Sequence, residues 1–115
     1  MGLVQTSQAQ GRIPVTVFHL QGRVNLGSFA ELEKTAKDAF DNGMRDLVID
    51  LSKSDSLTSI GVRALVVIYK MLSTDQGRHL KLAGPSPYLR EILDVSGVTQ
   101  SIEIHDTVEE AVASY

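Results

Sequence analysis

The chain has 115 residues, the usual size of one domain and enough to bury a core without disulfides or metals. Its 43% hydrophobic and 22% charged residues exclude disorder for most of the chain. Eleven Lys and Arg against 14 Asp and Glu give a net charge of −3, and without a basic run nucleic acid is not an expected partner. The absence of cysteine excludes disulfides, thiol catalysis and thiolate metal sites.

Membrane and export signals are also missing from the sequence. No stretch approaches the eighteen or so apolar residues that span a bilayer, and the N-terminus lacks the charged start and apolar centre of a signal peptide. We therefore expect a cytoplasmic protein without a membrane partner.

The first third of the chain predicts two strands and a helix. Residues 15–20 are rich in β-branched side chains and predict a strand closed by Gly22, and residues 3–9 predict a weaker strand joined to it by a turn. Ser28 and Glu31 have the spacing of a capping box, so we expect the helix to begin there and to end before Gly43.

The middle of the chain predicts a buried strand followed by a long helix. Residues 47–51 form a nearly continuous apolar run, which is typical of a central parallel strand. A polar loop follows, and then residues 59–73 have helical length. Residues 79–83 alternate like a further strand.

The last third predicts two more helices around a short strand. Ser86 is placed to cap a helix with Pro87 at its first position, and this helix ends near Gly97. Residues 101–104 predict a short strand, and a second capping box at residues 107–110 opens a final helix. The order β-β-α-β-α-β-α-β-α predicts one α/β domain over residues 1–115, with a mixed, mostly parallel sheet flanked by about four helices. Residues 1–11 are expected to form a weak edge strand or to be partly ordered.

Motifs for catalysis, cofactors and metals are absent from the sequence. His19, His79 and His105 fall in or beside separate strands without metal-ligand spacing, and we expect them to pack at strand edges or ends. The glycines form neither a phosphate-binding loop nor a dinucleotide fingerprint, and no nucleophile elbow is present. The sequence therefore predicts a protein that is not an enzyme, without catalytic residues, cofactor or metal.

Asp50 supports an alternative from another class. An aspartate at the end of a central strand is where a receiver domain carries its aspartyl phosphate, but that chemistry needs an acidic pair after an earlier strand to hold Mg²⁺. Residues 19–22 supply no acidic side chain. A receiver or small enzyme remains the less favoured hypothesis.

The segment from Asp50 to Leu65 is rich in hydroxyl side chains and leads from the buried strand into the helix. Capping of the helix explains the hydroxyls in part, because Ser and Thr satisfy the free N–H groups of a first turn. Apolar side chains, however, cover roughly 260° of the helical wheel, more than the usual stripe of about 100–140° that one sheet face absorbs. Some of Val62, Val66 and Tyr69 should reach the surface, which indicates a docking surface beside the serines.

Five short segments together resemble successive landmarks of the STAS domain, typified by bacterial anti-sigma factor antagonists. The similarity extends from about residue 13 to the C-terminus. The segments are Gly22-Arg23-Val24-Asn25, residues 47–52, Thr58-Ser59-Ile60-Gly61-Val62-Arg63-Ala64-Leu65, Gly84-Pro85-Ser86 and Val95-Ser96-Gly97-Val98. Many family members have Asp where this chain has Thr58, and the frequent Asp after the first strand is Asn25 here.

The resemblance implies partner switching controlled by a phosphoserine. It places the modified serine at Ser59, which an anti-sigma factor serine kinase phosphorylates and a PP2C-type phosphatase restores. The unphosphorylated antagonist binds the anti-sigma factor and releases the sigma factor. The partner-binding residues implied are Asn25, Thr58, Ser59, Ile60, Gly61, Val62, Arg63 and Val66.

The choice of Ser59 among neighbouring hydroxyls also has a local argument. The helical run begins at about Thr58, which makes Thr58 the expected N-cap and leaves the Ser59 hydroxyl to point outward. The alternative within the family is a STAS subunit of a transport or stressosome-like complex that is not phosphorylated. The sequence leaves open whether the chain forms a homodimer.

Overall fold

The computed structural model describes residues 4–24, 26–73 and 79–115. Within these residues five strands form one sheet in the order β1-β2-β3-β4-β5, antiparallel between β1 and β2 and parallel elsewhere. The strands are β1 (Val4–Gln10), β2 (Pro14–Val24), β3 (Leu47–Leu57), β4 (Leu80–Ala83) and β5 (Glu103–His105). The helices are α1 (Leu26–Asp41), α2 (Ser59–Leu72), α3 (Pro87–Ser96), the 3₁₀ turn η1 (Val98–Gln100) and α4 (Val108–Ala113). This order and the mixed sheet confirm the predicted fold class.

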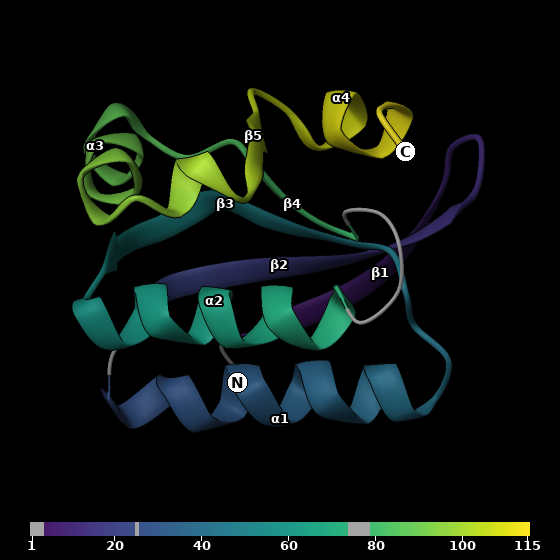
Figure 1. Ribbon diagram of the computed structural model, residues 1–115, viewed down its shortest axis with the longest axis horizontal. Coiled ribbons are helices and arrows are strands. Elements are labelled where there is room, and N and C mark those ends of the chain that lie inside the picture. The colour runs from purple at the N-terminus through teal and green to yellow at the C-terminus, as the bar shows by residue number, and fades with distance from the viewer. Residues whose placement is uncertain (1–3, 25, 74–78) are drawn as a thin grey trace.

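The two faces of the sheet carry different cores. In Figure 1, α1 and α2 lie side by side against one face, and α4 lies on the other. Alternate strand residues such as Phe18, Ile49 and Leu82 join one large apolar cluster with side chains of α1, α2 and α3. The residues between them, such as Val17 and Val48, join a small cluster with α4. Alternation along each strand thus places two separate cores on one sheet.

Two strands are longer than the sequence predicts. β3 continues through residues 52–57, which we expected to be a loop, because these polar residues pair with the end of β2. β2 likewise continues past Gly22, where the register of the ladder shifts and the backbone has a φ of 80°. Glycine adopts this conformation without strain, so the chain bends at Gly22 and stays in the sheet. The prediction that Gly22 closes the strand is therefore wrong.

The helix starts test four capping predictions. α1 begins at Leu26, so Ser28 lies inside the helix and the predicted capping box at residues 28–31 is wrong. The other three caps are confirmed: the side chains of Thr58, Ser86 and Thr107 accept hydrogen bonds from the N–H groups of Gly61, Leu89 and Glu110. These caps fix where α2, α3 and α4 begin.

None of the helices in the described ranges is long and apolar enough to cross a membrane.

Candidate functional site

Ser59 is the first residue of α2 and is exposed. The preceding residue, Thr58, has an extended backbone, and its Oγ1 accepts a hydrogen bond from the N–H of Gly61 at 3.2 Å. The capping hydroxyl is therefore that of Thr58, and Ser59, the next residue, is not the N-cap. The end of the central strand β3, the cap and the first helical turn together hold Ser59 at the surface.

The neighbouring serines of β3 have different surroundings. Ser54 is buried, with 7% of its surface exposed, and its Oγ has no hydrogen-bond partner. Ser56 is half-buried, whereas Ser52 is exposed and donates its backbone N–H to Asp50 at 3.0 Å. Ser52 and Ser59 are thus the exposed hydroxyl residues of this stretch, and Ser59 stands at a helix N-terminus.

A groove of about 510 Å³ lies between α2 and α3 beside Ser59. Its two most exposed apolar side chains come from α3: Tyr88 is 61% exposed and Val95 is 83% exposed. The residues that line the groove are Ser59, Val62, Tyr88, Glu91, Ile92, Val95 and Ser96. The sequence analysis pointed to α2 alone. Neither helix by itself shows which side chains of α2 and α3 come to lie beside each other in the fold.

The structure brings only some of the predicted partner-binding residues to this groove. Val62 is half-buried and lines it, whereas Val66 lines a separate hollow of about 170 Å³ with Tyr69 and Val98. Arg63 is exposed, and Ile60 is half-buried. Gly61 is buried and Asn25 lies outside the described residues.

Each histidine pairs with a carboxylate, which the sequence analysis missed. His19 Nδ1 lies 2.8 Å from Asp50 Oδ2, and His79 Nδ1 lies 2.7 Å from Asp46 Oδ1. His105 Nε2 lies 3.1 Å from Glu103 Oε1. The predicted positions at strand edges or ends hold for His79, directly before β4, and for His105, the last residue of the edge strand β5, whereas His19 lies within β2. Adjacent strands bring the first two pairs together across 31 and 33 positions, and His105 and Glu103 are two residues apart on β5. No cluster of three potential metal ligands occurs in the described ranges.

Asp50 is held by hydrogen bonds to both of its oxygens. Oδ2 contacts His19, and Oδ1 accepts the N–H of Ser52. Burial alone raises the pKa of Asp50, but the hydrogen bonds from Ser52 and His19 outweigh it, so this pKa lies below its ordinary value. The carboxylate is therefore ionised at neutral pH and fixed in orientation.

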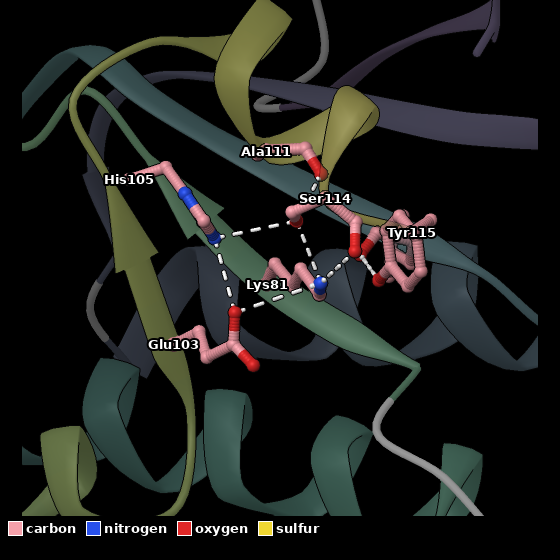
Figure 2. Close-up of polar contacts among 7 residues, drawn as sticks. Lys81, Glu103, His105, Ala111, Ser114 and Tyr115 are labelled. Atoms are coloured by element: carbon pink, nitrogen blue, oxygen red, sulfur yellow. Dashed lines mark hydrogen bonds and ion pairs between the residues drawn. The ribbon is translucent and has the colours of Figure 1, made fainter. Parts of the chain in front are cut away.

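A second polar cluster surrounds Lys81, as Figure 2 shows. Lys81 is 5% exposed, and its Nζ donates to Ser114 Oγ at 2.6 Å and to Ser114 O at 3.1 Å. Glu103 Oε1 lies 3.5 Å from the ammonium group, and the Tyr115 ring lies 4.4 Å from it. Tyr115 donates its hydroxyl to Leu47 O at 2.6 Å, and burial raises its pKa. The cluster attaches the end of α4 to the sheet.

The described residues thus form a small α/β domain in which an exposed serine at a helix start lies beside a groove. The profile of the STAS domain family matches residues 6–111, and the chain therefore belongs to the STAS domain family. BtrV of Bordetella bronchiseptica, which is described as an anti-sigma factor antagonist, is 32% identical over 96 residues, 84% of this chain and 82% of its own.

Solved structures of low sequence identity share the fold. A Thermotoga maritima protein described as an anti-sigma factor antagonist superposes with a TM-score of 0.86 at 20% identity, over 96% of this chain and 92% of its own. The phosphorylated form of the Bacillus cell fate determinant SpoIIAA superposes with a TM-score of 0.71 at 20% identity, over 96% of this chain and 97% of its own. These likenesses show a shared fold, and it is the 32% identity to BtrV that places the chain in the family of anti-sigma factor antagonists.

Proposed function

We propose that this protein is a partner-switching module that binds an anti-sigma factor serine kinase while Ser59 is unphosphorylated and releases it after phosphorylation. A PP2C-type phosphatase restores the binding form. The observation that carries the proposal is the position of Ser59, which is exposed at the start of α2 and lines the apolar groove between α2 and α3. One residue thus combines access for a kinase with contact to a surface that a partner can cover.

The first turn of α2 can accept a phosphate without unfolding. A phosphoserine carries about −1.5 to −2 charges at neutral pH, and free N–H groups at a helix N-terminus favour an anion. Arg63, four residues further along the helix, is exposed and adds a positive charge on the next turn. The modified protein should therefore keep its fold.

Docking is the step that the phosphate opposes. The groove beside Ser59 is formed mainly by apolar side chains, and Glu91 already places one carboxylate in its lining. Burying a phosphate charge against a partner there costs about 2–5 kcal/mol in desolvation and repulsion, or roughly 30-fold to several thousand-fold in affinity. The protein itself then needs no nucleotide, because ATP and Mg²⁺ belong to the kinase.

Phosphopeptide mapping after reaction with the cognate kinase tests the modified residue. We expect phosphate on Ser59, Ser59→Ala to stay bound to the kinase, and Ser59→Asp to bind more weakly with little loss of stability. Asn42→Asp is the matched control, because Asn42 is exposed and precedes β3, at the opposite end of that strand from Ser59. Phosphate on Ser52 or Ser56 would refute the assignment, and no phosphate would favour a subunit that does not switch.

A charge placed in the groove tests the docking surface separately. Val95→Glu adds a carboxylate at an 83% exposed position of α3, and we expect at least about tenfold weaker binding with an unchanged melting temperature. Val67→Glu is the control, because Val67 is 42% exposed on α2 but faces a different hollow, next to α1. Equal effects of the two variants would show that the partner does not use the groove between α2 and α3.

A further inference from the structure

Three side chains on neighbouring strands form a continuous hydrogen-bonded row on the face of the sheet that carries α4. Ser7 of β1 places its Oγ 2.8 Å from Nε2 of His19 on β2. The opposite ring nitrogen of His19, Nδ1, lies 2.8 Å from Oδ2 of Asp50 on β3. Ser7 is exposed, the His19 side chain is 34% exposed and the Asp50 side chain is 12% exposed. Burial thus increases along the row from Ser7 to the ionised Asp50.

The row fixes how protons are arranged. An ionised carboxylate can only accept hydrogen bonds, so His19 Nδ1 carries the hydrogen that it donates to Asp50. In the neutral imidazole Nε2 is then the acceptor, and the Ser7 hydroxyl must donate to it. The low pKa of Asp50 keeps this arrangement stable at neutral pH. A serine that donates to a histidine oriented by a carboxylate has the geometry of an activated nucleophile.

The cluster around His105 also combines a serine, a histidine and a carboxylate, but without this geometry. Ser114 Oγ lies 3.4 Å from His105 Nε2, and Glu103 Oε1 lies 3.1 Å from the same nitrogen, as Figure 2 shows. One nitrogen cannot both receive the serine proton and donate to the carboxylate. Ser114 also donates to Ala111 O at 2.7 Å. This cluster is therefore an internal control for the row that ends at Ser7.

Space for a small reactant lies beside His19 and Asp50, the two members of the row that line a pocket. A pocket of about 350 Å³ is lined by Gln5, His19, Leu20, Gln21, Asp50 and Lys53. The amide side chains of Gln5 and Gln21 and the Lys53 ammonium can donate hydrogen bonds to an oxygen that becomes negative during acyl transfer. The pocket suits a small polar acyl donor better than a long aliphatic chain.

We propose that Ser7 is an acylation site, with small activated esters or thioesters as acyl donors. The Ser7 Oγ attacks the acyl carbon while its proton passes to His19 Nε2. The bond from the acyl carbon to the leaving oxygen or sulfur then breaks, and the leaving group takes the proton from His19. The products are O-acyl Ser7 and a free alcohol or thiol. Asp50 is a positioning residue that holds the imidazole.

The test uses p-nitrophenyl acetate as the probe, with acid quenching and peptide mapping of the full chain. We expect acetyl on Ser7. We also expect Ser7→Ala and His19→Gln each to lower the rate of p-nitrophenolate release at least about 100-fold, once the uncatalysed background rate has been subtracted. Ser114→Ala is the matched control and should leave the rate unchanged. The melting temperature of each variant is measured as well, to establish whether the variant is folded.

Two outcomes would overturn the proposal. Release that depends on His19 but persists in Ser7→Ala would make His19 itself the nucleophile, and acetyl groups spread over exposed lysines would show general reactivity only. Asp50→Asn separates positioning from structure through the pH profile of the rate. We expect the pH profile to differ from that of the unsubstituted chain, because the variant removes the carboxylate that holds the imidazole, and an unchanged profile with a lower melting temperature would show a structural role alone.

Discussion

The two faces of the central sheet are built from the same strands but differ in chemistry. The face under α1 and α2 is closed by a large cluster in which Phe18, Ile49 and Leu82 are fully buried. The face under α4 has a small apolar cluster, and alternate positions there hold His19, Asp50 and Lys81. α4 has only six residues, so much of this face lies beyond its reach.

Within one domain, the first face thus contributes mainly apolar burial and the second face carries the polar groups. Side chains on one face supply apolar burial, whereas the other face can hold ionised groups because neighbouring strands supply partners for each. Ser59 belongs to neither face, since it stands at the end of β3 where α2 begins. A phosphate on Ser59 and an acyl group on Ser7 would therefore act on different surfaces.

The largest expected effect breaks the apolar face. Phe18→Ala removes a fully buried ring, and we expect the free energy of unfolding to fall by about 3–5 kcal/mol, measured by urea denaturation. Val17→Ala, one residue along the same strand, opens a smaller cavity under α4 and should cost about 1–3 kcal/mol. Equal losses would show that the two faces stabilise the domain alike.

An intermediate effect concerns the buried ammonium on the polar face. Lys81→Ala leaves Ser114 O and Glu103 without their cation, and we expect a loss of about 1–3 kcal/mol in the free energy of unfolding. Lys81→Met keeps most of the buried stem and should cost less. If Met and Ala are equally destabilising, the hydrogen bonds carry the contribution rather than the packing of the stem.

The smallest expected effect is a pH dependence that belongs to the polar face. The pKa of Asp50 lies below its ordinary value, because the hydrogen bonds from Ser52 and His19 outweigh the effect of burial. The pKa of Glu103 is lowered in the same way by His105 and Lys81. The folded state thus binds these protons more weakly than the unfolded state, so the stabilisation is complete above about pH 5 and is lost as the pH falls below it. Asp50→Asn should flatten the decrease in unfolding free energy between about pH 5 and pH 2. An unchanged slope would contradict the shift.

The sequence predicted the elements whose signal is local. The apolar run at residues 47–51 and the caps at Thr58, Ser86 and Thr107 are all found, because each depends on residues within one turn or one strand. The extension of β3 was missed because polar residues 52–56 resemble a loop until β2 is placed beside them. The helix start at Leu26 was missed because a capping-box spacing also occurs by chance inside a helix.

The candidate site was predictable only in part for the same reason. Ser59 follows from the helix start and the resemblance to STAS domains, but the groove needs Val95 of α3 across from α2. The pair of His19 and Asp50 depends on parallel register between β2 and β3, and no local pattern encodes that register. Long-range pairing thus decides the polar chemistry of this domain, whereas local pattern decides its elements.

The overhang of β3 beyond β4 has a consequence for motion. β3 pairs with β4 only over residues 47–50, so the segment from Ser52 to Leu57 has β2 as its single hydrogen-bonded neighbour strand. A strand end held on one side can separate at a lower free energy than the centre of the sheet. Amide hydrogens there should exchange with solvent before those of residues 47–50. The chain leading to Ser59 is already extended, and its separation from β2 would briefly expose it to an enzyme that acts on a peptide segment, while the large core stays folded.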